Sequence, residues 1–367
     1  MLKQYKLKNY KFTLIFLVAA LTILGILLIG SAQPDVQKKQ ILGFAAGLVI
    51  MLIVSVIDYS FILKFSWLIY LFMVGILALV RLMGDSSGGA QRWFEIGSFR
   101  FQPSELAKIL LILFFAYYFF KHEEKINTPR VLLGSFVLAG IPLYLIVKQP
   151  DLSTTIVTAL IFAAMLFVAG ISYKLVIGVL AVSIPSFFVV MSLVIQGNFP
   201  LLQGFQSNRI MAWLYPDDYP DLAYQQQNSI MAIGSGQLWG KGLNNTDVTS
   251  VKNGNFILES QTDFIFAVAG EELGFIGTAV IIILLLFITI ECILIARKAK
   301  DIAGKLICCG MAALIGFQSF INISVASGLM PNTGLPLPFV SYGLTSLMSL
   351  YIGIGLVLNV GLQPKKY

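Results

Sequence analysis

The sequence contains little charge, a single histidine and few cysteines. Charged residues make up 12% of the 367 positions, about half of the share typical of a soluble domain. The only histidine, His122, lies in a charged stretch, and Cys292, Cys308 and Cys309 lie in apolar runs without a C-x-x-C pair. These absences argue against a histidine-dependent catalytic triad, a histidine-rich metal centre and a disulfide framework.

Hydrophobic residues, in contrast, make up 57% of the chain, and the mean hydropathy is +0.86. One soluble core cannot hide so much apolar surface, because a globule of this size still needs a polar exterior. A soluble enzyme, a disordered chain and a fibrous protein are therefore excluded. Apolar runs without alternation indicate membrane-spanning helices rather than a membrane barrel. We predict an all-α polytopic membrane protein whose residues 1–367 form a single integral membrane domain.

Ten stretches are long and apolar enough to span a bilayer as helices. The first follows a cluster of lysines, but its apolar part is longer than the ~7–15 residues of a signal peptide, so we interpret it as a retained span. The predicted spans are about 12–31, 41–57, 65–83, 105–120, 131–147, 153–170, 174–196, 264–296, 302–326 and 339–361.

Ten spans place both termini on one side of the membrane. Lysine and arginine concentrate in the segments of that side, so the positive-inside rule predicts an N-in/C-in topology. The net charge of +7 then reflects topology and not nucleic-acid binding. Lys38 and Lys39, on the outer side, are an unexplained exception. The predicted inner cations are Lys3, Lys6, Lys8, Lys11, Lys64, Lys121, Lys125, Arg130, Lys174, Arg297, Lys298, Lys300, Lys305, Lys365 and Lys366.

Two long segments lie on the predicted outer face, residues 84–104 and residues 197–263. The second is the large extracytoplasmic loop between the seventh and eighth spans. It far exceeds the usual length of a connection, so we expect it to be functional or to have structure of its own.

Residues 89–108, GAQRWFEIGSFRFQPSELAK, carry charge to the edge of the fourth span. Ionisable residues at membrane depth are costly and usually mark a working site. Glu105 and Lys108 are three positions apart on one helix face. They either form a structural ion pair that fixes the helix end or belong to a polar face that binds an anionic head group, with Arg92 and Arg100 nearby.

Residues 259–277, ESQTDFIFAVAGEELGFIG, precede and begin the longest apolar stretch. A helix over 264–296 would be ~50 Å long, whereas the hydrocarbon core is ~30 Å thick. We therefore expect its start to emerge on the outer face, to tilt steeply or to break near Gly270. Asp263 lies at this start, where it either caps the helix or acts as a general base at a membrane-edge cleft.

Two glycine-rich segments complete the polar motifs. Residues 327–347, SGLMPNTGLPLPFVSYGLTSL, include Ser341 and either form an ordinary loop or dip into the membrane beside a cavity. Residues 224–242, YQQQNSIMAIGSGQLWGKG, include Lys241 but lack the G-x-x-x-x-G-K-[ST] pattern of a nucleotide-binding loop. ATP binding is therefore excluded.

These motifs, in this order, resemble the SEDS family (shape, elongation, division and sporulation), which includes RodA and FtsW. The resemblance covers essentially the whole chain and extends to KQPDLSTT at 148–155 and TGLPLPFVSYG at 333–343. Residues 208–221 and 236–242 look slightly more like RodA than FtsW, which favours a role in elongation over division.

The resemblance implies a peptidoglycan glycosyltransferase. Such enzymes polymerise lipid II, the undecaprenyl-pyrophosphate-linked disaccharide-pentapeptide, outside the bacterial cytoplasmic membrane. Asp263 corresponds to the essential carboxylate of the family. The family converts an α-linked donor into a β-linked product, so a single inverting displacement needs a general base but no enzyme nucleophile. The chain departs from the family pattern at Leu258, at Gln261, where histidine is usual, and at Leu344, where glycine is usual.

The departing diphosphate needs positive charge or hydrogen-bond donors around it. No nucleotide cofactor is required, and no dedicated metal site is evident, although a divalent cation could screen the diphosphate. The expected partners are lipid II, membrane lipids and a class B penicillin-binding protein. The candidate substrate-binding or site-shaping residues are Arg92, Arg100, Glu105, Lys108, Lys241 and Ser341.

Two other functions are compatible with the same features. A lipid II flippase would need ionisable groups along a path through the bilayer, whereas here they concentrate at the predicted outer face. A non-catalytic scaffold that recruits the penicillin-binding protein would not depend on the Asp263 carboxylate.

Overall fold

The computed structural model describes residues 10–87, 90–96, 99–196, 204–244, 250, 256–258 and 260–363. Parts of the motifs above, including Glu259, and the terminal lysines at 3, 6, 8, 365 and 366 lie outside these residues. The helices are α1 (Phe12–Ala32), α2 (Pro34–Val56), α3 (Tyr59–Leu63), α4 (Ser66–Met83), α5 (Pro103–Lys121), α6 (Pro129–Lys148), α7 (Leu152–Val168), α8 (Tyr173–Ile195), α9 (Gly204–Leu214), α10 (Pro220–Ser235), α11 (Ile265–Arg297), α12 (Ile302–Ala326) and α13 (Leu344–Leu362), with a short 3₁₀ turn at Glu123–Lys125.

The protein is an all-α polytopic membrane protein. Eight helices in the described part of the chain are long and apolar enough to cross a membrane: α1, α2, α4, α5, α6, α11, α12 and α13. The apolar helix α7 has 17 residues, and α8 has 23. Large hydrophobic side chains such as Leu68, Leu71 and Phe72 of α4 are more than half exposed, as expected for a surface that faces lipid.

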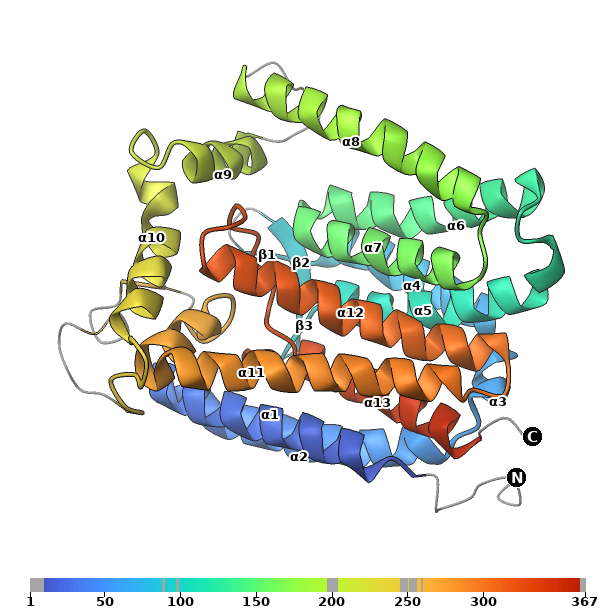
Figure 1. Cartoon of the computed structure of the whole chain (residues 1–367), viewed down its shortest axis with the longest axis horizontal. Helices are drawn as coiled ribbons and strands as arrows, with labels where there is room; N and C mark the ends of the chain where they lie inside the picture. Colours follow the sequence, from blue (N-terminus) through green and yellow to red (C-terminus); the bar gives the residue numbers. More distant parts are fainter. Residues whose placement is uncertain are drawn as a thin grey trace.

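Helices α5, α12 and α13 form the buried centre of the bundle (Figure 1). Helix α12 lies between α11 and α7, and α13 packs along α2. Helix α8 makes no extensive contact with any other described helix and lies apart from the bundle in Figure 1. Helix α8 therefore contributes little to the packing of the core.

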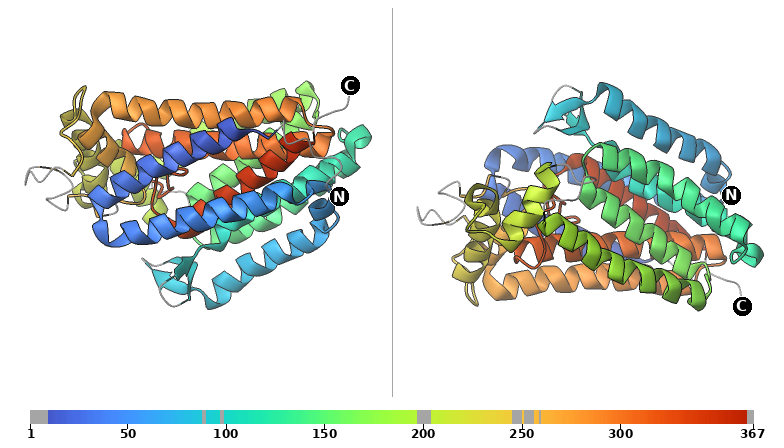
Figure 2. Two further views of the ribbon diagram at one scale, coloured as in Figure 1. Left: turned by 90° about the horizontal axis from the view of Figure 1, so that it is seen from below. Right: turned by 90° about the horizontal axis from the view of Figure 1, so that it is seen from above.

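Segment 84–104 forms a small antiparallel sheet that the sequence analysis did not predict. Its strands are β1 (Asp85–Ser87), β2 (Ala90–Ile96) and β3 (Phe99–Phe101), in the order β1-β2-β3. The large loop between α8 and α11 contains α9 and α10, so the expectation that it has structure of its own is met. The sheet, α9 and α10 lie toward the same end of the molecule (Figure 2).

Of the three alternatives given for the longest helix, the structure shows a break, four residues after Gly270. Helix α11 has 33 residues, and Gly274 inside it has non-helical angles of φ 64° and ψ −163°. Two pairs of backbone bonds surround this break: Lys241 N–H and Gly242 N–H donate to the carbonyls of Glu271 and Glu272, and Phe275 N–H and Ile276 N–H donate to Gln237 and Leu238. The segment after α10 thus crosses the break in α11.

Glycines make this crossing possible. A Cβ at Gly274 would lie 2.3 Å from Gly240 N, and a Cβ at Gly240 would lie 2.2 Å from Glu272 O. A Cβ at Gly236 would lie 1.9 Å from Gly270 O. The glycine-rich motif at 224–242 is therefore needed where two backbones meet.

Candidate active site

A cleft of about 690 Å³ lies where the two outer segments and the α12–α13 connection meet. Asp263, which precedes α11, lines it. Cations from four different segments also line it: Lys39 of α2, Arg92 of β2, Arg100 of β3 and Arg209 of α9. The lining therefore contains four cations and two carboxylates, Asp263 and Glu95, so its wall carries a net positive charge.

Hydrogen bonds to three consecutive main-chain carbonyl groups fix the backbone around Asp263. Tyr342 N–H donates to Gln261 O at 2.9 Å. The Ser341 hydroxyl donates to Thr262 O at 2.6 Å, and Asn322 Nδ2 donates to Asp263 O at 2.8 Å. These donors come from α12 and the α12–α13 connection, which lie far away in the sequence. Satisfying buried carbonyls in this way holds the carboxylate in one place.

Gly334 leaves space for the Asp263 side chain. A Cβ at Gly334 would lie 3.3 Å from Asp263 Oδ2 and 4.0 Å from Arg209 Nη1. Gly334 also has φ +73°, a conformation that glycine adopts without steric cost. The Asp263 carboxylate and the Arg209 guanidinium therefore both lie beside the loop that contains Gly334.

Arg92 and Arg209 are held by main-chain oxygens. Arg92 donates from Nε to Gln149 O at 2.8 Å and from Nη2 to Pro150 O. Arg209 Nη1 donates to Asn332 O at 3.4 Å. Burial lowers the pKa of Arg209, and the charge of Arg92 lowers it further, whereas Asp263 and Asp151 raise it. These four charged groups therefore act on one another electrostatically.

Arg100 is tied to a neighbouring acid. Its Nε lies 2.7 Å from Glu95 Oε1, and the two side chains are 62% and 43% exposed. An exposed pair of this kind contributes little to stability. Arg100 can therefore exchange its partner for a ligand phosphate at small cost.

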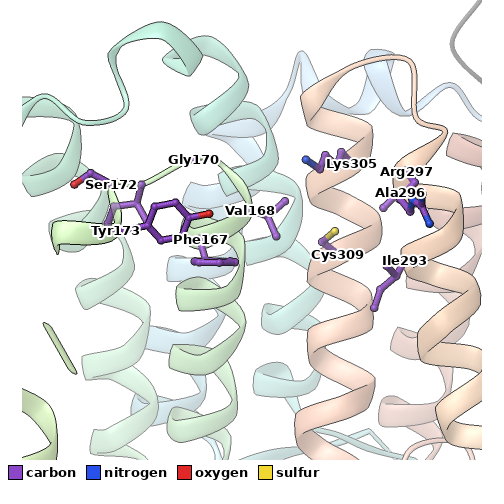
Figure 3. A pocket seen from close by; sticks show the side chains of 11 residues that line it. Phe167, Val168, Gly170, Ser172, Tyr173, Ile293, Ala296, Arg297, Lys305 and Cys309 are labelled. Atoms are coloured by element: carbon purple, nitrogen blue, oxygen red, sulfur yellow. The ribbon is translucent and has the colours of Figure 1, made fainter. Parts of the chain in front are cut away.

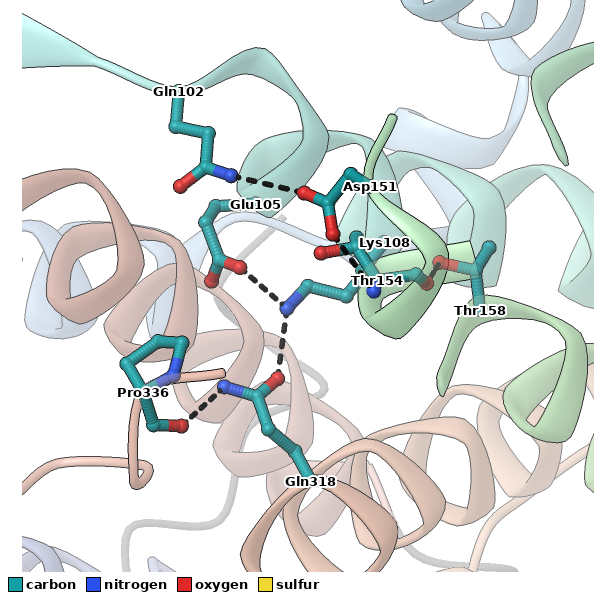
Figure 4. Close-up of polar contacts among 8 residues, drawn as sticks. All are labelled: Gln102, Glu105, Lys108, Asp151, Thr154, Thr158, Gln318 and Pro336. Carbon is teal, nitrogen blue, oxygen red and sulfur yellow. Dashed lines mark hydrogen bonds and ion pairs between the residues drawn. The ribbon is translucent and has the colours of Figure 1, made fainter. Parts of the chain in front are cut away.

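Glu105 and Lys108 of α5 are not among the residues that line the cleft, and Figure 4 shows their contacts. Their side chains are 4% and 1% exposed, and Lys108 Nζ lies 2.7 Å from Glu105 Oε1. Lys108 also donates to Gln318 Oε1 at 2.7 Å, and Gln318 Nε2 donates to Pro336 O at 2.9 Å. Since Pro336 lines the cleft, this chain of contacts supports the cleft wall from beneath.

Lys241 and Ser341 also contact protein groups. Lys241 Nζ lies 2.8 Å from Glu271 Oε1, beside the break in α11 and outside the cleft lining. The Ser341 hydroxyl accepts a hydrogen bond from Leu337 N–H and donates to Thr262 O, as described above. Ser341 therefore acts on the position of residue 262 and is not itself in the lining.

The sequence analysis missed Lys39 and Arg209 as members of the cleft. A signal for Lys39 was present, because Lys38 and Lys39 were the exception to the positive-inside pattern. Lys39 lines the cleft, which gives this cation a role other than topology, whereas Lys38 is not in the lining. Arg209 gave no comparable signal. No group of three or more His, Cys, Asp or Glu side chains in the described ranges is arranged to hold a metal ion.

The chain is similar to known proteins over its full length. A family model described as "Cell cycle protein", whose name combines FtsW, RodA and SpoVE, matches residues 4–366. The chain is 32% identical to the probable peptidoglycan glycosyltransferase FtsW of Geobacter sulfurreducens, covering 98% of this chain and 97% of the relative. It is 34% identical to the peptidoglycan glycosyltransferase MrdB of Escherichia coli K12, covering 96% and 94%.

Solved structures share the fold. A chain of a peptidoglycan synthase complex that coordinates polymerization and crosslinking aligns with a TM-score of 0.79 and 29% identity over 96% of this chain and 97% of that chain. The rod shape determining protein RodA of Thermus thermophilus aligns with a TM-score of 0.69 and 28% identity over 96% of both chains. The match of the family model to nearly every residue and the relatives above 30% identity lead to one conclusion: the chain belongs to the SEDS family of FtsW, RodA and SpoVE proteins.

Proposed function

We propose that the cleft around Asp263 is the active site of this protein, a peptidoglycan glycosyltransferase of the SEDS family that acts in cell-wall synthesis. The observation that carries the proposal is the composition of the cleft, in which Asp263 lies among Lys39, Arg92, Arg100 and Arg209. A glycosyl transfer from a lipid diphosphate needs a base for the acceptor and positive charge for the leaving group. The cleft contains both.

In the proposed reaction, a hydroxyl oxygen of the acceptor sugar attacks the anomeric carbon of lipid II. The Asp263 carboxylate accepts the hydroxyl proton as the new carbon–oxygen bond forms. The bond between the anomeric carbon and the diphosphate oxygen breaks, and its electron pair stays on that oxygen. The diphosphate leaves while still attached to the lipid carrier. A single displacement inverts the configuration and forms no covalent bond to the enzyme.

Arg92 and Arg209 are the strongest candidates for binding the diphosphate. A guanidinium group can donate two parallel hydrogen bonds to phosphate oxygens and remains charged at neutral pH. Each already donates to a main-chain carbonyl, which orients both side chains before substrate binds. Lys39 and Arg100 extend the positive wall. No cofactor takes part in the proposed reaction, and a divalent cation would only screen the diphosphate.

We further propose that all ten apolar helices α1, α2, α4–α8 and α11–α13 span the membrane, with both termini in the cytoplasm. The start of α1 and the end of α13 are neighbours, since Lys11 Cγ lies 3.7 Å from a Cβ built at Gly361. This proximity supports an even number of spans. The cleft lies at the opposite end, beside α9, the sheet and the break in α11, so the active site faces the extracytoplasmic side of the cytoplasmic membrane.

A class B penicillin-binding protein is the proposed partner that cross-links the new strand. The similarity to a chain of a peptidoglycan synthase complex, which coordinates polymerization and crosslinking, supports this proposal. Relatives named FtsW and MrdB are similar to the chain at nearly equal identity. The proposal of an elongation role rests on residues 208–221. Its test is whether the protein restores rod shape in cells depleted of their own elongation enzyme.

The test of the active site is glycan polymerisation from lipid II by the purified full-length protein with its transpeptidase partner. We expect Asp263→Asn to lower the rate by ~10²–10⁴-fold, the usual contribution of a positioned base, with a smaller change in KM. Asp217→Asn is the matched control, because Asp217 is an exposed acid outside the cleft.

Equal rates for the wild type and Asp263→Asn would refute the assignment of the base. If neither protein makes polymer but both move labelled lipid II across reconstituted vesicles, the protein is a flippase. Normal cell-wall synthesis in cells that contain only Asp263→Asn would instead indicate a scaffold.

A further inference from the structure

A second groove, of about 480 Å³, lies at the other end of α11 from the active-site cleft. Three parts of the chain form it: the end of α7 with the turn that leads into α8, the last turns of α11, and the first turns of α12. Figure 3 shows Phe167 and Tyr173 on one side of the groove and Ile293 and Arg297 on the other. The groove therefore lies between spans, at the edge that the proposed topology assigns to the cytoplasm.

The groove has a basic rim and apolar walls. Arg297 and Lys305 line it, both are exposed, and neither forms an ion pair with a described residue. No aspartate or glutamate is among its lining residues. The walls include Phe167, Tyr173 and Ile293, which are 52%, 73% and 43% exposed. Two cations above exposed aromatic and aliphatic side chains form an amphipathic site.

The chemistry of the groove identifies its occupant. A free anion would satisfy the cations but leave the aromatic walls uncovered, whereas a phospholipid has a phosphate and acyl chains that match both parts. Helix α8 makes no extensive contact with the other described helices, so this side of the groove is not closed by tight helix packing. Basic pockets between spans on the cytoplasmic side suit anionic headgroups of the inner leaflet.

We propose that this groove binds an anionic phospholipid of the inner leaflet. The phosphate lies between Arg297 and Lys305, and the acyl chains lie on Phe167, Tyr173 and Ile293. The lipid thereby fills the space between α7, α11 and α12 and links the sparsely packed start of α8 to the bundle. This site is separate from the cleft in which the lipid-linked substrate reacts.

The test is native mass spectrometry of the full-length protein with dioleoyl-phosphatidylglycerol and, separately, dioleoyl-phosphatidylcholine. We expect the wild type to retain phosphatidylglycerol in preference to phosphatidylcholine. Each juxtamembrane cation contributes a factor of about five to the affinity for anionic lipid, so Arg297→Gln/Lys305→Gln is expected to bind phosphatidylglycerol roughly 25-fold more weakly. Lys64→Gln/Lys298→Gln is the matched control, because both residues are exposed and lie outside the groove lining.

Three results would overturn the proposal: equal retention of the two lipids, an unchanged affinity of the groove variant, and an equal loss in the control variant. Displacement of bound phosphatidylglycerol by millimolar inorganic phosphate would show a simple anion site and overturn it as well. A photoactivatable phosphatidylglycerol provides a test on the wild type alone. Its crosslinks are expected in peptides that contain Phe167 or Ile293, and crosslinks only elsewhere would contradict the site.

Discussion

At the scale of single residues, the position of the Asp263 carboxylate, the proposed base, depends on neighbours outside the cleft lining as well as on one within it. Ser341 and Asn322 bond to the main chain of residues 262 and 263, and Gly334 leaves room for the carboxylate. Asp263 could be singled out as a candidate because an acid at the start of a span is chemically conspicuous, and the structure places it in the lining of the cleft. Its supports could not, since an uncharged hydroxyl or amide in a loop has many ordinary roles.

Replacement of Ser341 by alanine tests this support. The change removes the donor to Thr262 O and the acceptor for Leu337 N–H, and each buried group left without a partner costs ~1–3 kcal/mol. We expect kcat for glycan polymerisation to fall roughly 5- to 100-fold with a smaller change in KM, and Ser341→Thr to restore part of it. Ser327→Ala, which removes a hydroxyl bonded only to nearby helix carbonyls, should leave kcat within twofold.

Arg209 provides a second test at this scale. Loss of a charge-assisted hydrogen bond to phosphate costs ~1.5–3 kcal/mol, so Arg209→Gln is expected to lower kcat/KM for lipid II about 10- to 150-fold. Steady-state kinetics of the purified protein with its partner measure this effect. Arg130→Gln removes an exposed arginine outside the cleft and serves as the control; an equal loss there would show that the effect is one of overall charge.

At the scale of elements, the position of the break in α11 shows what a sequence can predict. Length shows only that a 33-residue helix exceeds the thickness of the hydrocarbon core, and a break was one of three expected ways to accommodate it. The location of the break does not follow from length, because the break is set by the close approach of Gly240 to Gly274. The sheet at 85–101 was missed for a related reason: its strands are short, and their pairing depends on contacts that the local pattern does not contain.

Gly274→Ala tests the crossing. Gly274 has φ 64° and ψ −163°, a region of backbone conformation that is essentially restricted to glycine and costs ~1–3 kcal/mol for other residues. The added methyl group would also clash with Gly240 N. We expect a lower thermal unfolding midpoint and a lower folded yield in detergent. Gly75→Ala in α4, where a Cβ meets nothing within 4 Å, should be neutral or slightly stabilising.

At the scale of the whole molecule, the distribution of cations serves two purposes. Most of them lie in segments that the sequence analysis assigned to the inner side by the positive-inside rule. Lys39 and the arginines of the cleft lie at the other end, where they form a positive site and not a topological signal. Only the folded chain distinguishes the cleft cations from the topological ones, because the cleft cations come from four separate elements, α2, β2, β3 and α9.

Cysteine accessibility tests the proposed orientation. We expect Leu329→Cys, in the connection between α12 and α13, to react with a membrane-impermeant maleimide in intact spheroplasts, since Leu329 is 70% exposed. Lys298→Cys, beyond the end of α11, should react only after permeabilisation. Labelling of the wild type, which has three native cysteines, provides the background. The opposite pattern would reverse the topology.

The break at Gly274 has a mechanical consequence. It separates the short stretch next to Asp263 from residues 275–297, which are about 35 Å long as a helix. Spans adapt to a thinner or thicker bilayer by tilting. Because residues 237–242 bond to the backbone on both sides of Gly274, the two parts of α11 are held at one angle, and a tilt of the long part is passed on to the stretch next to Asp263. Turnover by this protein should therefore depend on lipid chain length.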